Sequence, residues 1–426
     1  MRVLRKLAVS LLLLVPDNLR RRTYGLICTL TMGLASFVSR RRRKDANSPI
    51  RIAIFDRRLT GNLRAFVERM QQMGAPIEFG FLSLDLDREQ IDHKRLPKWV
   101  RPLDGFRLRD MCWAIQADVF LTSIRANRFR RLVQAFNPHV KFVQVFHSIS
   151  LTADPPVWFE HMGRFDALFC SSEWMGREVF ATRNIETGRI RPTGFACLDE
   201  LAAPPKTRDE ICRQLGLDPD RKVILIAPTL STAEMAAGHV PITNPEFLQR
   251  LNGWAASHDV QIVIRAHPHE RPSVTDLPDQ SHLLHRPALK YPKAIEQLLA
   301  TDILVSDASG IAVYFLGLGR PIVFWNAELP NDRNATFLSA TDLPGPNVDT
   351  AESLLAALTE VLCDPASHQA RYGALLAAAR ERAFGDTLDG HAAERYYEEI
   401  CRLLGLSASL PAGGNSHSGT AGKKAA

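Results

Sequence analysis

The sequence has few cysteines, and none stands in a metal-binding or disulfide-rich arrangement. Its 426 residues contain seven cysteines, and no two form a C-x-x-C or C-x-x-H pair. This spacing argues against a zinc module and a disulfide framework, and it fits a reducing compartment. The chain also lacks G-x-G-x-x-G after its first apolar β-rich run, and it lacks G-x-x-x-x-G-K-[ST]. Neither a dinucleotide site nor a P-loop is therefore indicated.

An excess of positive charge is absent from most of the chain. The formal net charge is +7, but residues 1–50 hold 11 Lys and Arg against two Asp, and the other 376 residues hold 42 basic and 44 acidic groups. A general nucleic-acid-binding protein needs a basic face on its folded domain. The near-neutral body excludes that class, so no nucleic-acid partner is expected. The positive charge belongs to the N-terminal segment.

No apolar run in this N-terminal segment reaches the roughly 20 residues that one spanning helix needs. The runs Leu7–Val15 and Tyr24–Val38 are separated by Pro16 and flanked by arginines at 20–22 and 40–43. A signal peptide or a disordered tail is the alternative, but no A-x-A-like cleavage site follows the first run. Residues 1–49 are therefore predicted to associate with a membrane as an interfacial or re-entrant segment. Residues 1–44 would contact anionic headgroups of the cytoplasmic leaflet.

The rest of the chain has the composition and pattern of a globular α/β protein. With 46% hydrophobic and 23% charged residues, collagen-like, disulfide-scaffold and wholly disordered classes are excluded. Apolar strands alternating with helical stretches predict parallel sheets covered on both faces. The alternation restarts after the linker-like Ala202–Pro205. We therefore expect two doubly wound, Rossmann-like domains at 50–203 and 204–406 with a cleft between them, and a disordered tail at 407–426.

The elements expected from apolar spacing are as follows. Strands are predicted at 50–55, 77–82, 119–122, 140–146, 167–170, 223–227, 261–266, 303–306 and 322–325. Helices are predicted at 62–73, 108–117, 128–136, 173–181, 208–215, 245–257, 309–318, 350–362, 367–384 and 390–404.

Polar residues at the ends of three predicted strands are the candidates for chemistry, because open parallel sheets bind ligands at the carboxyl ends of their strands. His147 follows the strand at 140–146, where an imidazole can accept a proton from an attacking hydroxyl. Arg265 and His267 end the strand at 261–266, and a cation beside an imidazole suits a phosphate whose charge grows as a bond breaks. Ser309 and Gly310 follow the strand at 303–306, where helix-terminal N–H groups suit a diphosphate.

Each of these candidates also has a structural interpretation that needs no ligand. A histidine at a strand end is often only hydrogen-bonded within the protein, and Asp307 or Ser309 can simply cap the following helix. The H-x-H spacing of His267 and His269 has no nearby carboxylate or cysteine set to complete a metal site. No metal is therefore predicted.

Taken in order along the chain, these sites resemble the CDP-glycerol:poly(glycerophosphate) glycerophosphotransferase family, the teichoic-acid-type polymerases with a GT-B fold. His147 matches the strand-end histidine of the family's W-H-G-T, and Ala266-His267-Pro268 matches its L-H-P. The other matches are Thr193–Asp199 with T-G-x-P-R-x-D, Ala227-Pro228-Thr229 with A-P-T, Thr301–Gly310 with A-D-x-L-I-T-D-Y-S-S, Arg320-Pro321-Ile322 with K-P-I, and Asp389–Arg395 with D-G-x-A-x-x-R. The resemblance covers roughly residues 140 to 400.

The resemblance implies transfer of a glycerol phosphate or related polyol phosphate from a CDP-linked donor to a hydroxyl of a lipid- or polymer-linked acceptor, with release of CMP. It implies two catalytic residues, His147 as the base and His267 at the diphosphate. The nucleotide- and phosphate-binding residues would be Arg265, Asp307, Ser309, Gly310, Thr229 and Arg320. No cofactor and no metal are implied, and the enzyme would work at the cytoplasmic face of the bacterial inner membrane, peripheral or monotopic.

The departures from the family pattern leave the donor open. Ser148 stands where the family has glycine, and Tyr314 stands where it has an acidic residue suited to ribose hydroxyls. CDP-glycerol, CDP-ribitol and a nucleotide sugar are all possible donors. Two alternative functions therefore remain open: a GT-B glycosyltransferase that uses a nucleotide sugar, and a non-catalytic membrane adaptor.

Overall fold

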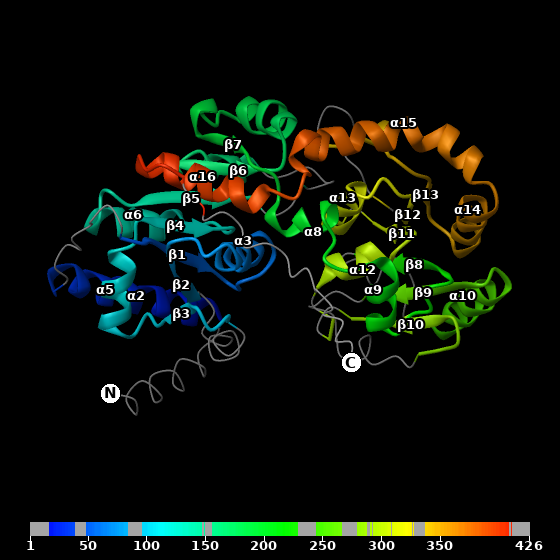
Figure 1. Ribbon diagram of the computed structural model, residues 1–426, viewed down its shortest axis with the longest axis horizontal. Helices are drawn as coiled ribbons and strands as arrows, with labels where there is room; N and C mark the ends of the chain where they lie inside the picture. Colours follow the sequence, from blue (N-terminus) through cyan, green and yellow to red (C-terminus); the bar gives the residue numbers. More distant parts are fainter. Residues whose placement is uncertain are drawn as a thin grey trace, which may run out of the picture. The chain divides into compact units, whose positions relative to one another are not determined.

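The structure is a computed structural model, and it describes residues 17–38, 48–83, 96–146, 149, 156–228, 244–265, 279–287, 290–291, 293–307, 309–325, 327, 337–408 and 410. Two parallel β-sheets organise the described chain (Figure 1). The first sheet has the order β3-β2-β1-β4-β5-β6-β7 and the second β10-β9-β8-β11-β12-β13. In both orders the chain starts in the middle, builds outward to one edge and then crosses to build the other side. This confirms the predicted fold class of two doubly wound parallel sheets.

The strands of the first sheet are β1 (Ile50–Asp56), β2 (Ile77–Ser83), β3 (Val100–Leu103), β4 (Val119–Thr122), β5 (Lys141–Val145), β6 (Ala167–Cys170) and β7 (Ile190–Pro192). Those of the second are β8 (Lys222–Ile226), β9 (Val260–Ile264), β10 (Leu283–His285), β11 (Ile303–Ser306), β12 (Ile322–Trp325) and β13 (Asn347–Val348). Central strands such as β4, β9 and β11 are buried along their whole length. Their burial reflects helices packed on both faces of the sheet.

The α-helices in the described residues are α2 (Asp17–Val38), α3 (Gly61–Gln72), α5 (Leu108–Ile115), α6 (Asn127–Phe136), α7 (Pro156–Met162), α8 (Asp199–Ala202), α9 (Arg208–Leu215), α10 (Pro245–Ser257), α12 (Ala294–Ala300), α13 (Gly310–Leu316), α14 (Ala351–Cys363), α15 (Pro365–Phe384) and α16 (Ala392–Leu404). Several begin at a side-chain cap. Thr207 and Glu210 form a capping box at α9, and Asn244 accepts hydrogen bonds from the first turn of α10. These caps satisfy backbone N–H groups that have no partner within the helix.

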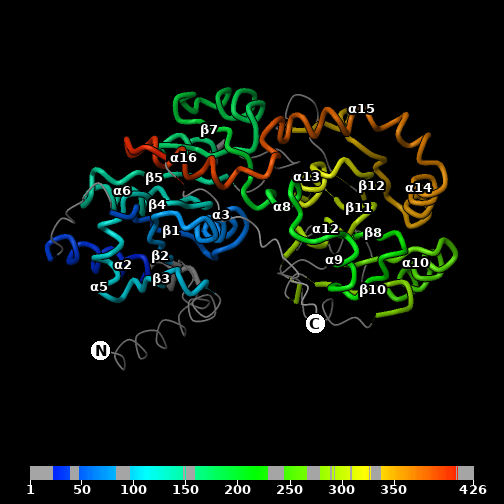
Figure 2. The backbone as a smooth tube through the Cα atoms, in the orientation of Figure 1, coloured from blue at the N-terminus to red at the C-terminus, as the bar shows by residue number. Residues whose placement is uncertain are grey.

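Contacts divide the chain into two compact units, residues 1–145 with 393–426 and residues 146–392. The last helix belongs to the first unit although it ends the described chain (Figure 2). The ring of Tyr396 lies 5.7 Å from that of Phe66 in α3, and Glu394 pairs with Arg69 at 2.6 Å. The C-terminal helix is thereby part of the core that covers the first strands.

Helix α2, which lies within the predicted membrane-associating segment 1–49, packs on the first unit. It is one continuous helix, and it packs against α5 and α6. Tyr24, Cys28, Met32 and Ala35 are buried on this side. Because removing α2 would expose their partners, deletion of residues 1–44 should destabilise the first unit. No helix among the described residues is long and apolar enough to cross a membrane.

A glycine permits the close approach of α2 to the first unit. A Cβ atom on Gly105 would lie 2.3 Å from the Cys28 sulfur and 3.0 Å from the Tyr24 hydroxyl. We expect Gly105→Ala to lower the free energy of unfolding by about 1–3 kcal/mol, the usual cost of overpacking. Urea denaturation measures it, and the double variant with Cys28→Ala should regain part of the loss. Additive effects of the two changes would contradict a direct contact.

A buried histidine makes stability depend on pH in the second unit. His368 in α15 is 5% exposed, and burial lowers its pKa from the ordinary value of 6.5. Between the folded-state and unfolded-state pKa values, the unfolded chain binds the proton and the folded chain does not. His368 therefore leaves the free energy of unfolding unchanged above pH 6.5 and lowers it as the pH drops below that value. Urea denaturation at pH 7.5 and 5.5 should show a smaller loss for His368→Gln than for the wild type. An equal loss in both proteins would contradict this role.

Candidate active site

The candidates Arg265, Asp307, Ser309 and Gly310 adjoin one edge of the second sheet, where the strand order reverses between β8 and β11. Ser306 at the end of β11 donates a 2.7 Å hydrogen bond from its hydroxyl to the Ala227 carbonyl, and the Ala227 N–H bonds to the Val305 carbonyl. On the other side, the Arg265 N–H bonds to the Ile226 carbonyl. The residues that follow β8, β9 and β11 therefore lie along one carboxyl edge at the topological switch point. Doubly wound sheets bind ligands in this position.

Arg265 is a buried cation at this edge. The residue is 9% exposed, and one guanidinium nitrogen donates a 2.8 Å hydrogen bond to the Tyr291 carbonyl. No described carboxylate pairs with it. Burial lowers the pKa of its guanidinium to about 10, so the group is still charged at neutral pH. Burying a charge that no opposite charge balances costs free energy, and the buried charge of Arg265 is positive.

A second buried arginine beside the same sheet has a purely structural role. Arg286, which follows β10, is 7% exposed, and it forms a 3.0 Å ion pair with Asp279. It also donates to the carbonyls of Leu215 and His285. Arg286 is therefore neutralised within the protein. By contrast, Arg265 has no carboxylate partner among the residues that the structure describes.

The third candidate group adjoins β11 at the same edge. Ser309 caps α13, and its hydroxyl oxygen accepts a hydrogen bond from the Ile311 N–H at 3.4 Å. Gly310 is the first residue of the helix, and Asp307 lies in the bend before it. The structure thus shows Ser309 as the N-cap of α13, as its structural interpretation predicted. It also places the start of α13 at the edge that carries Arg265.

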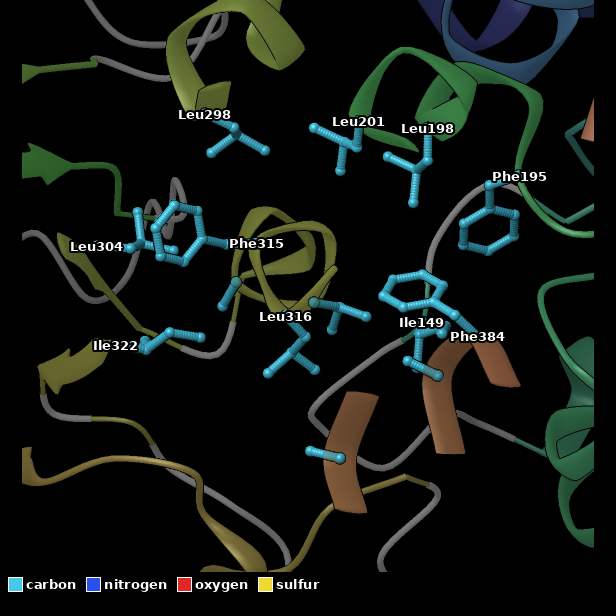
Figure 3. Close-up of a cluster of buried hydrophobic side chains, with 14 of the residues drawn as sticks. Ile149, Phe195, Leu198, Leu201, Leu298, Leu304, Phe315, Leu316, Ile322 and Phe384 are labelled. Carbon is cyan, nitrogen blue, oxygen red and sulfur yellow. The ribbon is translucent and has the colours of Figure 1, made fainter. Parts of the chain in front are cut away.

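Three candidates, His147, His267 and Thr229, lie outside the described residues. The residues on either side of His147 are anchored, because Phe146 is 6% exposed and Ile149 1%. Both belong to one buried cluster with residues of α13 such as Phe315 and Leu316. Figure 3 shows Ile149 beside Phe384 and Leu316 in this cluster. The cluster therefore ties the segment that carries His147 to the helix that follows Ser309.

Arg320 is not brought together with the other candidates. It precedes β12, at the opposite end of the strand from the site edge. Its guanidinium donates hydrogen bonds to the carbonyls of Leu299 and Thr301 at the end of α12. Arg320 therefore stabilises a helix terminus in this structure, and we leave it out of the proposed site.

Two features were not predictable from the motifs. The carbonyl that holds Arg265 comes from Tyr291, whose only signal is an aromatic residue before a proline after β10. Tyr314, at the family's acidic position, lies with its ring 6.0 Å from that of Phe195. Burial raises the pKa of the neighbouring Cys197 thiol to about 12, although a hydrogen bond with Tyr314 acts in the opposite direction. Tyr314 therefore packs on the motif at 193–199.

In the described part of the chain, no three His, Cys, Asp or Glu side chains gather as a metal site.

Comparison with known families and proteins agrees with this architecture. The family described as CDP-glycerol:poly(glycerophosphate) glycerophosphotransferase matches residues 34–402. The chain is 25% identical over 350 residues to the teichoic acid poly(ribitol-phosphate) polymerase of Bacillus spizizenii, covering 80% of this chain and 54% of that protein. It is 23% identical over 327 residues to the teichoic acid ribitol-phosphate polymerase TarK of Staphylococcus aureus, covering 70% and 59%. The chain thus spans little more than half the length of these relatives.

A solved structure shows the same fold. The chain superimposes on the wall teichoic acid polymerase TagF, in a variant soaked with CDPG, with a TM-score of 0.67 and 17% identity. The match covers 91% of this chain and 96% of the other. The two parallel-sheet α/β arrangement is therefore GT-B-like, as the motifs implied.

Proposed function

The chain belongs to the CDP-glycerol:poly(glycerophosphate) glycerophosphotransferase family, and we propose that it transfers a polyol phosphate from a CDP-linked donor to a hydroxyl of a cell-envelope polymer, releasing CMP. The family is named for a glycerol phosphate transfer, whereas two matched relatives are ribitol-phosphate polymerases. The donor class is therefore a CDP-linked polyol, with glycerol and ribitol as the two candidates.

The observation that carries this proposal is the buried charge of Arg265 at the switch-point edge, which pairs with no carboxylate among the described residues. A diphosphate bound there would supply an anion and accept charge-assisted hydrogen bonds from the guanidinium. Ser309 and Gly310 stand at the same edge, where the N–H groups that open α13 favour a phosphate. Asp307, His267 and Thr229 complete the proposed donor site.

The reaction is an attack by the acceptor hydroxyl on the phosphorus atom that carries the polyol. The new bond joins the acceptor oxygen to that phosphorus, and the broken bond joins the phosphorus to the bridging oxygen of the diphosphate. His147 takes the proton of the attacking hydroxyl. The leaving CMP gains negative charge, which Arg265 and His267 stabilise.

The test is a donor panel with the purified full-length protein. CDP-glycerol, CDP-ribitol and UDP-glucose are each supplied with a soluble lipid-primer analogue that carries glycerol phosphate, and nucleotide release is followed. We expect CMP from one CDP-polyol and no UDP. Release of UDP alone would favour the nucleotide-sugar glycosyltransferase. Absence of both release and donor binding by calorimetry would favour the non-catalytic adaptor.

We also propose that the enzyme works at the cytoplasmic face of the bacterial inner membrane, as a peripheral or monotopic protein. A lipid- or polymer-linked acceptor would be found there. The basic residues within 1–44 favour an anionic membrane surface.

A further inference from the structure

We propose that Tyr291 is a positioning residue for Arg265, and that its ring, packed beside Arg286, fixes the carbonyl that orients the Arg265 guanidinium toward the donor diphosphate. The inference rests on the proposed function, in which Arg265 contacts that diphosphate. It gives a role in donor binding to the turn that follows β10.

The guanidinium of Arg265 is oriented by a backbone carbonyl. Its Nη1 atom donates a 2.8 Å hydrogen bond to the Tyr291 carbonyl, and no described carboxylate pairs with the group. A carbonyl is a neutral acceptor, so it orients a guanidinium without cancelling its charge. Because the guanidinium is planar and rigid, its other N–H groups are then fixed in direction. A diphosphate that binds them avoids the free-energy cost of immobilising a long side chain.

The local backbone restricts this carbonyl. Tyr291 ends a tight turn, in which its own N–H and that of Lys290 donate to the Pro287 carbonyl at 2.9 and 3.1 Å. The next residue in the sequence is Pro292, and a residue before proline is largely confined to extended backbone conformations. The peptide group that carries the Tyr291 carbonyl therefore has little freedom to rotate.

The Tyr291 ring fastens the turn to the rest of the second unit. The ring packs against a large buried hydrophobic cluster, and the guanidinium carbon of Arg286 lies 5.4 Å from its centroid. A cation over an aromatic face attracts it. Arg286 is itself anchored, because it forms an ion pair with Asp279 at 3.0 Å and donates to the carbonyls of Leu215 and His285. The ring is therefore held by a cation that is fixed in the protein.

The same turn is attached to both sides of Arg265. Strands β9 and β10 are parallel neighbours in the second sheet (Figure 1). The Arg286 N–H donates to the carbonyl of Ile264, the residue before Arg265, at 2.9 Å. At its other end the turn receives the Arg265 side chain on the Tyr291 carbonyl. Loosening the Tyr291 ring should therefore change the orientation of the Arg265 guanidinium.

The test is calorimetry of CMP binding to the full-length protein. Tyr291→Leu keeps the carbonyl and an apolar side chain but loses the ring. It should weaken CMP binding about three- to tenfold, because the ligand must then order the arginine itself. Tyr291→Phe keeps the ring and should bind CMP like the wild type. An equal loss in both variants would place the tyrosine hydroxyl on the ligand and overturn the positioning role.

Tyr372→Leu is the matched control for Tyr291→Leu. Tyr372 is a half-buried tyrosine of α15, and the guanidinium carbon of Arg371 lies 5.6 Å from its ring centroid. No candidate site residue lies on α15. This variant should bind CMP like the wild type, and thermal melting checks that both leucine variants fold. A loss of affinity in Tyr372→Leu equal to that in Tyr291→Leu would assign the effect to general destabilisation and overturn the inference.

A double-mutant cycle with Arg265→Met separates positioning from direct contact. If Tyr291 acts through Arg265, Tyr291→Leu should cause no further loss of CMP affinity once Arg265 is methionine. A further three- to tenfold loss in that background would show that the ring contacts the ligand itself, as an aromatic ring stacked on the nucleobase would. That outcome would overturn the positioning role.

These outcomes are distinguishable from failure of the proposed function, because CMP binding is measured without turnover. If Arg265→Met loses CMP affinity and Tyr291→Leu keeps it, the positioning role falls and the proposed anion site stands. If Arg265→Met keeps wild-type CMP affinity, the proposed anion site falls and the positioning role falls with it. If no donor supports turnover but CMP binding changes as expected here, the positioning role stands and the transferase proposal falls.

Discussion

Replacing His147 with alanine is expected to lower turnover about 10²–10⁴-fold, the usual contribution of a general base. Donor affinity and thermal stability should change little, because the proposed role of His147 is to take the proton of the acceptor hydroxyl. Its neighbours Phe146 and Ile149 are buried, so the segment stays anchored without the imidazole. Steady-state CMP release with the active CDP-polyol measures the effect.

The control for this experiment comes from the same strand. His139 is exposed and lies just before the amino end of β5, whereas His147 follows its carboxyl end. His139→Ala should therefore keep wild-type turnover. Wild-type turnover in His147→Ala would remove this histidine from the mechanism.

Replacing Arg265 with methionine is expected to lower kcat/KM about 10²–10³-fold, as loss of one donor to a developing negative charge does. The unliganded protein should lose little stability, because the change also removes a buried charge that has no described carboxylate partner. Arg265→Lys keeps the charge without the guanidinium fork, so its activity should lie between those of methionine and arginine. Calorimetry with the donor and with CMP separates binding from turnover.

Arg320→Met is the matched control for Arg265→Met. Both arginines belong to the second unit, and burial lowers the pKa of each guanidinium. Arg320 donates to the carbonyls that end α12, so its loss should reduce stability and leave donor affinity unchanged. If Arg320→Met lost donor affinity and Arg265→Met kept it, the proposed anion site would be misplaced.

The interior strands of both sheets were predictable because each is marked by an apolar run of neighbouring residues. Runs such as Val119–Thr122 and Ile303–Ser306 are unbroken and apolar, as strands covered on both faces must be, and they appear as β4 and β11. The ends of such strands also share one edge whenever the sheet is parallel. For that reason the sequence alone predicts that Arg265 and Asp307 lie at one edge of the sheet.

The four strands that the pattern does not predict are β3, β7, β10 and β13, and they are the outer strands of the two sheets. They are two to four residues long, Pro102 lies within β3, and Pro192 ends β7. An edge strand has one free side, so it tolerates proline and short length. Its existence depends on the neighbour it pairs with, and a sequence window does not contain that neighbour.

The sequence by itself determined the fold class, the ordered motifs of the family and the polar residues at the strand ends, because these depend on local spacing. Only the tertiary structure decided which arginine has no carboxylate partner among the described residues. Arg265, Arg286 and Arg320 all stand beside strands. Arg286 pairs with Asp279, seven residues before it, and Arg320 donates to helix-end carbonyls 21 and 19 residues before it. The same holds for α2, whose apolar residues are split by packing into a buried and an exposed side. Pairing and burial between distant residues set the energy of a charge or an apolar group.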